Sequence, residues 1–152
     1  MKMIELKQQL YNCCLDYVNG RDQTIRNLIE EIQESLESET KNSAGDKHET
    51  GRAMLQLERE KIGNQFSETQ KIKETLLKID VSKSSSTVTL GSIVYTTQNN
   101  YFISISAGEI KINELTFYAI SLNTPIGKLL LSKMVGDEIV FRNEKFQVTD
   151  II

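Results

Sequence analysis

The segment Ser43-Ala-Gly-Asp-Lys-His-Glu-Thr-Gly-Arg-Ala-Met54 decides how the first half of this chain folds. It is polar, and it separates two long stretches in which apolar residues recur at helical spacing. Two narrow apolar seams joined by a short turn are expected to pack as an antiparallel coiled coil. The turn of that hairpin, near residues 42–50, carries the two carboxylates of Asp46 and Glu49.

The apolar pattern predicts three helices within residues 1–80. We expect Asn19-Gly20 to interrupt the first helix, and Asp22 to cap the start of the second. The third helix follows the polar turn and is expected to run for about 30 residues. The stripes are formed by Leu6, Leu10, Cys13 or Cys14, and Tyr17 in the first helix, Ile25, Leu28, Ile29, Ile32 and Leu36 in the second, and Leu55, Ile62, Phe66, Ile72, Leu76 and Ile79 in the third.

The composition changes near residue 81, where Glu, Gln and Lys give way to the Val, Ile, Thr, Tyr and Phe that strands favour. We therefore expect a helical domain at 1–80, a polar linker at 81–86 and a β-rich domain at 87–152. A short helix at 125–131 is predicted, with Thr124 as N-cap and Pro125 in its first position. The predicted strands are Thr87–Leu90, Ser92–Thr96, Tyr101–Ile105, Leu115–Ile120, Glu138–Phe141 and Glu144–Ile151, and Arg142-Asn-Glu144 has the composition of a turn.

The overall totals favour an ordinary globular protein of one or two domains. The 152 residues are 39% hydrophobic and carry a net charge of −3, which argues against general coating of nucleic acid. No apolar run is long enough for a transmembrane helix, and the charged N-terminus is unlike a signal peptide. The adjacent Cys13 and Cys14 are interpreted as small buried hydrophobes in a reducing cytoplasm.

Two motifs resemble those of the Gre transcript-cleavage factors. The run Ile120-Ser-Leu-Asn-Thr-Pro-Ile-Gly-Lys-Leu-Leu-Leu-Ser-Lys-Met-Val-Gly-Asp-Glu138 is similar to the family's "S-x-N-S-P-[IL]-[AG]-[RK]-x-L-[IL]-x-K-x-x-G-D". The turn Gly45-Asp-Lys-His-Glu49 matches the family's "G-D-x-x-E", and the ending Phe146–Ile152 resembles the family's last strand. The motifs occur in the family's order, so the resemblance covers nearly the whole chain.

The resemblance implies an α+β protein: an N-terminal antiparallel coiled-coil hairpin, then an FKBP-like antiparallel β domain with a short helix. It implies bacterial RNA polymerase as partner, with the β domain docked at the rim of the secondary channel and the hairpin inside it. The tip carboxylates would help to hold Mg²⁺ and an attacking water while the polymerase cleaves a backtracked transcript. The protein would then have no cofactor of its own and would not itself be an enzyme. We expect a cytoplasmic monomer that reaches the nascent RNA 3′ end indirectly.

Matched residue by residue, Asp46 and Glu49 take the two acidic tip positions. Asn123, Thr124 and Pro125 take the docking positions, with Thr124 where many members have Ser. The chain departs from the family after Glu49, where Thr50-Gly-Arg-Ala53 replaces the usual "N-A-E-Y". This departure puts the strength of any cleavage activity in question.

Other interpretations of the same residues stay open. Spacing alone favours a different role for Asp46-Lys-His-Glu49, that of a capping box that opens the third helix, and the two roles can coexist. Lys41, Lys47 and Arg52 could steer RNA near the tip, or they could belong to a solvated face of mixed charge. Two other functions remain: a regulator that occupies the secondary channel and inhibits transcription without cleavage, and a coiled-coil interaction module with no polymerase contact.

Overall fold

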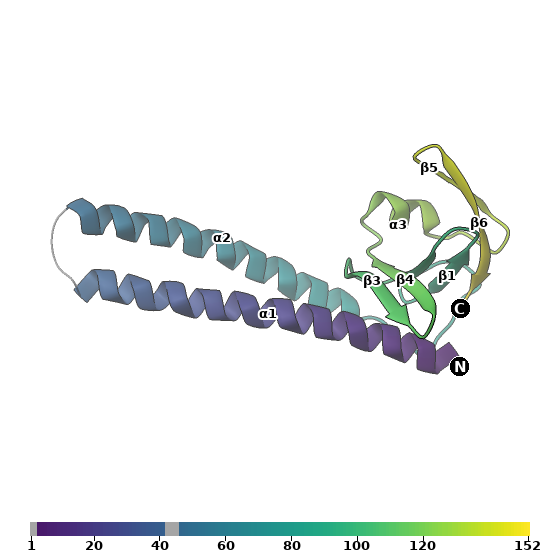
Figure 1. The fold of residues 1–152 in the computed structure, drawn as a ribbon, viewed down its shortest axis with the longest axis horizontal. Coiled ribbons are helices and arrows are strands. Elements are labelled where there is room, and N and C mark those ends of the chain that lie inside the picture. The colour runs from purple at the N-terminus through teal and green to yellow at the C-terminus, as the bar shows by residue number, and fades with distance from the viewer. Residues whose placement is uncertain (1–2, 42–45) are drawn as a thin grey trace. The chain divides into compact units, whose positions relative to one another are not determined.

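The structure is a computed structural model that describes residues 3–41 and 46–152, with side chains described for 3–39 and 50–152. It is an α+β protein in which two long helices, α1 (Met3–Lys41) and α2 (Asp46–Leu77), precede a six-stranded sheet (Figure 1). The chain forms two compact units. The first combines Met1–Tyr17 with Lys73–Ile152, and the second is Val18–Ile72. These two units are defined by which residues contact one another. The domain boundaries expected from the change in composition, at residues 81 and 87, stay a prediction.

The helical region, as far as the structure describes it, contains two helices in place of the three predicted, because α1 continues through Asn19-Gly20. A glycine inside a helix costs about 1 kcal/mol relative to alanine. Burial of apolar side chains on both sides of Gly20, such as Val18 and Ile25, outweighs that cost. Asp22 consequently lies inside a helix and does not cap one.

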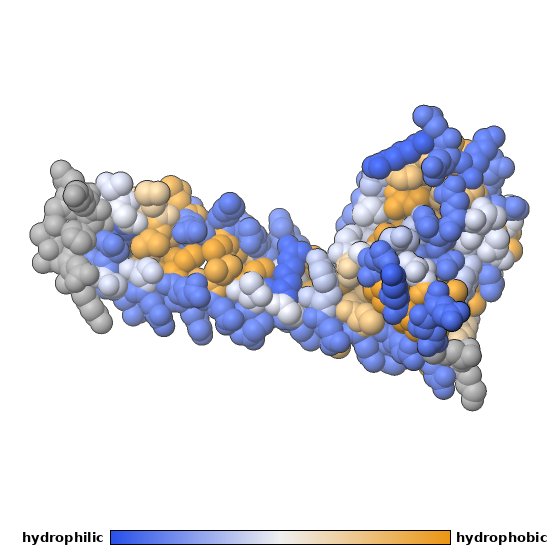
Figure 2. Space-filling model, viewed as in Figure 1, coloured by the Kyte–Doolittle hydropathy of each residue, from blue (hydrophilic) through white to orange (hydrophobic). Residues whose placement is uncertain are grey.

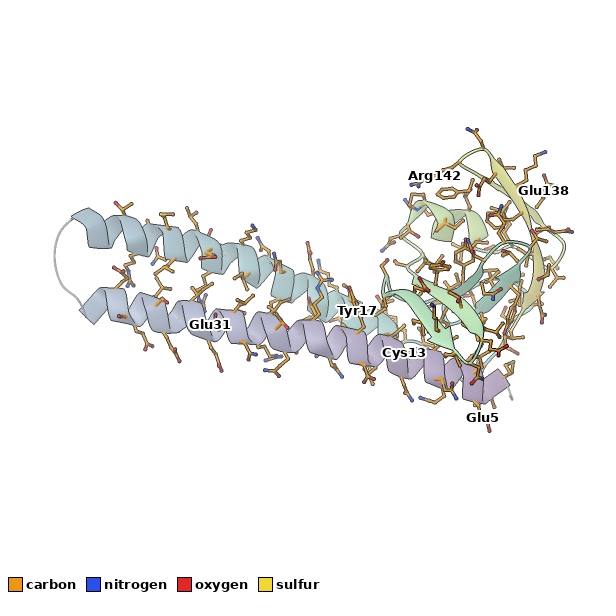
Figure 3. The ribbon with its side chains drawn as sticks, in the orientation of Figure 1. Glu5, Cys13, Tyr17, Glu31, Glu138 and Arg142 are labelled. Carbon is orange, nitrogen blue, oxygen red and sulfur yellow. The ribbon has the colours of Figure 1, made fainter. Side chains whose placement is uncertain are left out.

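The buried apolar stripe at the start of α1 ends at Val18, where the prediction had placed Tyr17. Leu6, Leu10 and Cys14 are buried at intervals of four residues, and Val18 continues the stripe. Tyr17 and Cys13 were expected on this stripe or in the core, but both are exposed (Figure 3). Each step of four residues turns the buried stripe by about 40° around the helix, so at the level of Cys14 and Val18 the buried face has rotated away from the direction of Tyr17.

The second unit is held together by an apolar seam between its two helical segments. Ile25, Ile32 and Leu36 of α1 form a buried cluster with Ile62 of α2, and Ile29, Leu55 and Phe66 pack against it. On the face that Figure 2 shows, hydrophobic residues gather along this seam and hydrophilic residues border them. Most residues of the predicted second and third stripes therefore meet as expected, but Leu28, which was predicted to belong to the second stripe, is exposed.

The sheet of the first unit has the strand order β3-β4-β2-β1-β6-β5. Among the described strands only β2 and β4 pair in parallel, and the other four neighbouring pairs are antiparallel. The core includes Val94, Ile103, Leu130, Ile139 and Phe146. The strands are β1 (Ile93–Thr96), β2 (Asn100–Ile103), β3 (Gly108–Ile112), β4 (Leu115–Ile120), β5 (Glu138–Phe141) and β6 (Glu144–Ile151), and the short helix α3 is Pro125–Leu130.

Most of the predicted strands are confirmed, and two predictions about strands were wrong. Residues 87–90 form only an isolated bridge, between Thr87 and Met134. Strand β3 was missed, although its buried Ile110 and Ile112 alternate with exposed neighbours as a half-buried strand requires. The predicted turn before β6 is confirmed. Arg142 and Asn143 both have positive φ, which is what the two central residues of a type I′ hairpin turn need.

Candidate functional site

The predicted tip of the hairpin falls where the structure gives little detail. Helix α1 ends at Lys41 and α2 begins at Asp46, so Asp46 and Glu49 fall within the first turn of α2. The side chains of Lys41, Asp46, Lys47 and Glu49 lie outside the described residues. The competing predictions for the two acids, helix capping and metal delivery, therefore both remain predictions.

Arg52 is the first predicted site residue of this region whose side chain is described. Its Nη1 donates a hydrogen bond to the Leu36 carbonyl oxygen at 3.1 Å, so the guanidinium joins α2 to α1. Arg52 also borders an open groove of about 510 Å³ between the two helices. The charged residues that line the groove are two arginines, Arg52 and Arg59, and two glutamates, Glu37 and Glu60, so the groove has no net charge.

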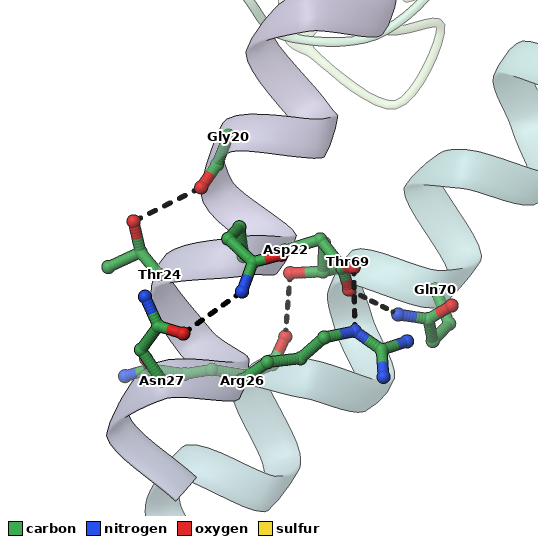
Figure 4. Close-up of polar contacts among 9 residues, drawn as sticks. Gly20, Asp22, Thr24, Arg26, Asn27, Thr69 and Gln70 are labelled. Atoms are coloured by element: carbon green, nitrogen blue, oxygen red, sulfur yellow. Dashed lines mark hydrogen bonds and ion pairs between the residues drawn. The ribbon is translucent and has the colours of Figure 1, made fainter. Parts of the chain in front are cut away.

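A layer of polar side chains crosses the seam between α1 and α2 (Figure 4). It joins Asp22 to Gln70, which lie near the two ends of the segment Val18–Ile72 that forms the second unit. The Asp22 carboxylate, on a residue only 6% exposed, accepts hydrogen bonds from Arg26 Nε at 2.9 Å and from Gln70 Nε2 at 2.8 Å. The Arg26 guanidinium also lies over the Phe66 ring, 4.9 Å from its centroid. The sequence pattern did not indicate this layer, because it placed Asp22 at a helix start.

The three predicted docking residues are brought together in the turn that opens α3. Thr124 Oγ1 accepts a hydrogen bond from the Gly127 N–H at 3.1 Å and donates one to the Ser121 carbonyl at 2.7 Å. The predicted N-cap is therefore confirmed, with Pro125 directly after it. The side chains of Asn123 and Pro125 are exposed, while Thr124 is half-buried within the turn. Thr124 fixes the backbone, and its two neighbours are available for contact.

Gly127 is a further residue on which this turn depends. A Cβ atom at this position would collide with the Ser121 carbonyl oxygen and lie 2.9 Å from Thr124 Oγ1. The close approach of the chain at this point is therefore open only to glycine. In the sequence, the sign of this tight turn was the glycine that follows Pro125 by two residues.

Exposed apolar side chains follow the turn along α3 and the loop after it. Leu129 and Leu131 are 38% and 42% exposed, and Met134 and Val135 are 53% and 56% exposed. Single exposed apolar residues are common, but these four lie within seven positions of the sequence, directly after the ordered turn. The predicted docking positions thus have exposed apolar neighbours within the matched run, where Leu131 takes a position that the motif keeps apolar and the other three take positions that it leaves open.

The described residues contain no group of three or more His, Cys, Asp or Glu placed to hold a metal ion. In the part of the chain that the structure describes, no helix has the length and apolar content that crossing a membrane requires. No protein-family model matches the chain, and no curated protein matches it.

Proposed function

We propose that the protein is an accessory factor that binds bacterial RNA polymerase in its secondary channel and stimulates cleavage of backtracked transcripts. The observation that carries the proposal is the pairing of two features in one chain. Helix α2 of the two-helix hairpin begins with Asp46-Lys-His-Glu49, and an ordered turn exposes Asn123 and Pro125 on the β-rich unit. Both features fall at the positions that the resemblance to the Gre family implies.

The proposed chemistry belongs to the polymerase, and the protein contributes Asp46 and Glu49. Hydrolysis of a phosphodiester by two metal ions needs oxygen ligands for Mg²⁺ and an oriented water. Positions three residues apart at the start of a helix are neighbours on its surface, which suits two carboxylates acting together. Mg²⁺ would be shared with the polymerase, and the protein would have no catalytic activity alone. We place the activity in the bacterial cytoplasm, with the protein acting as a monomer.

The proposed docking element is the turn from Ser121 to Gly127. Its internal hydrogen bonds hold the backbone before binding, so little conformational entropy is lost when a partner contacts Asn123 and Pro125. The exposed Leu131 and Val135 add apolar surface nearby in the sequence. An FKBP-like classification of this unit, and coiled-coil packing of the hairpin, are part of the same proposal.

The test is transcript cleavage by stalled, backtracked complexes of the cognate polymerase. We expect added protein to raise the cleavage rate, and expect Asp46→Asn and Glu49→Gln each to reduce it by at least tenfold. Glu68→Gln is the matched control, because Glu68 is an exposed acid of α2 far from the hairpin turn. An unchanged cleavage rate on addition of the wild-type protein would contradict the proposal.

A second candidate function is a channel-binding regulator that inhibits transcription without stimulating cleavage. Arg52 favours it, because a guanidinium that contacts the Leu36 carbonyl stands at the position that matches the acid of the family's "N-A-E-Y". Inhibition of initiation in the absence of cleavage, lost on Pro125→Ala, would support this regulator. Absence of any polymerase binding would instead leave only an interaction module of another kind.

A further inference from the structure

A polar pocket lies in the first unit beside the start of α1 and the segment that follows α2. It has a volume of about 280 Å³. Lys7, Lys78 and Lys83 line it together with the hydroxyl-bearing Ser84, Ser85 and Thr89. The docking turn contributes no residue to this lining, so the proposed function does not account for the pocket.

Lys7 is the unusual member of this lining. It is 1% exposed, and its Nζ donates a hydrogen bond to the Lys83 carbonyl oxygen at 2.7 Å. An ammonium group has three N–H donors, and among the residues that the structure describes this neutral carbonyl is its one hydrogen-bond acceptor. Burial lowers the pKa of Lys7, an effect that the negative charge of Asp80 opposes. A buried ammonium facing a polar pocket with unused donors calls for an anion there.

The charges around the pocket favour the same ligand. Three lysines line it against one carboxylate, that of Asp80, which gives the lining a net charge of +2. The Asp80 Oδ1 atom already accepts hydrogen bonds from the Ser82 N–H at 3.0 Å and the Ser82 hydroxyl at 2.6 Å. Those bonds lower the pKa of Asp80, so it stays charged and is held by its own turn. The excess positive charge is left to attract an anion from solution.

We propose that this pocket binds a phosphate group, with the Lys7 ammonium as its buried ligand and Lys78 and Lys83 as flanking charges. Hydroxyl groups of Ser84, Ser85 and Thr89 supply further donors, as a tetrahedral oxyanion with several acceptor oxygens requires. The volume lies below the range of about 300–1,000 Å³ typical of pockets for drug-sized ligands. The pocket therefore fits a single phosphate or the terminal phosphate of a larger molecule.

Titration with inorganic phosphate, at an ionic strength held constant with chloride, tests the site. We expect phosphate to raise the melting temperature of the wild-type protein and to shift the amide resonances of Ser84 and Ser85. Lys83→Gln, whose side chain is exposed, should weaken phosphate binding at least tenfold, and Lys7→Met should abolish it. Lys145→Met, which removes an exposed lysine of β6, is the matched control and should bind as the wild type does.

Two outcomes would overturn the site: equal amide shifts in phosphate and in chloride, or equal phosphate binding by the wild type and Lys83→Gln. The Lys83 variant keeps the test decisive if Lys7→Met fails to fold. Inorganic pyrophosphate is the second probe. Binding at least tenfold tighter than phosphate would identify a phosphoanhydride as the natural source, and equal affinity would identify free phosphate.

Discussion

The Asp22 carboxylate of α1 accepts a hydrogen bond from the Gln70 amide of α2 at 2.8 Å, across the seam of the hairpin. The same carboxylate accepts a hydrogen bond from Arg26, one turn further along α1. The buried contact with Gln70 specifies register, since sliding one helix past the other by a turn would separate the Asp22 carboxylate from the Gln70 amide. Register in turn decides which residues reach the hairpin turn together.

Replacement of Asp22 by alanine should therefore destabilise the hairpin. The Gln70 hydrogen bond to the charged carboxylate contributes about 1.5–3 kcal/mol, and the Arg26 pair contributes less because Arg26 is half exposed. Alanine recovers about 0.5 kcal/mol of helix propensity, so we expect a loss of about 1–3 kcal/mol in the free energy of unfolding. Urea unfolding followed by circular dichroism at the helix band measures it. Gln23→Ala is the control, because the Gln23–Asn27 hydrogen bond has similar geometry but is exposed, and it should change stability by less than about 0.5 kcal/mol.

The two glycines Gly127 and Gly63 should respond in opposite directions to alanine. Gly127→Ala forces the new methyl group against the Ser121 carbonyl, so we expect a loss of about 1–3 kcal/mol and of polymerase binding. Gly63 lies inside α2, and no atom lies within 4 Å of the place that an alanine methyl group would take, so Gly63→Ala should stabilise the protein by about 0.5–1 kcal/mol. Thermal unfolding of the two variants measures both. Equal effects would contradict the tight turn at Gly127.

The adjacent cysteines should differ sharply in reactivity. Cys13 is exposed, whereas Cys14 is buried and contacts Ser104, with 3.6 Å between Sγ and Oγ. Burial raises the pKa of Cys14 to about 11, with a smaller contribution from Cys13 that the Ser104 contact opposes. Since the thiolate is the reactive form, Cys13→Ser should label with iodoacetamide at pH 8 at least tenfold more slowly than Cys14→Ala. Equal rates in the folded proteins would contradict the burial of Cys14.

The same pKa shift predicts a decline of stability in alkali. The thiol of Cys14 ionises near 9.0 when exposed and near 11 in the folded protein, so between these values the unfolded chain binds fewer protons than the folded one. Stability must then fall as pH rises from about 9 to about 11. Urea unfolding of the wild type and of Cys14→Ala across this range isolates the effect, because other titrating groups are common to both. Parallel pH profiles would show that Cys14 does not contribute.

Sequence patterns predicted an element correctly where its local residue preferences agree with the way in which it packs. Strands β4, β5 and β6 have the predicted bounds, and Thr124 with Pro125 marked the start of α3 correctly. Asn19-Gly20 failed as a helix stop because a local preference worth about 1 kcal/mol competes with burial on a long apolar face. Strand β3 was missed because its apolar pattern is short. Only two of its residues are buried, and the other three are Gly108 and the charged Glu109 and Lys111.

The candidate site was predictable only where a motif covers it. The sequence pointed to Thr124 and to the acids of the hairpin turn, but it did not pair Asp22 with Gln70 or Lys7 with the Lys83 carbonyl. Those contacts join residues 48 and 76 positions apart, and no local pattern encodes such distances. They depend on which helix faces meet, which tertiary packing decides.

The strand order also sets a sequence of events during synthesis of the chain. The second unit, Val18–Ile72, is contiguous, so its hairpin can form as soon as its own residues have emerged. The first unit joins Met1–Tyr17 to Lys73–Ile152, and its strand β1 pairs with β6, which ends at Ile151. The sheet therefore cannot be completed until β6 has emerged, and until then β1 lacks one of its two neighbours. The long-range pairing makes this unit the slower to fold, and the one more exposed to misassembly before β6 has emerged.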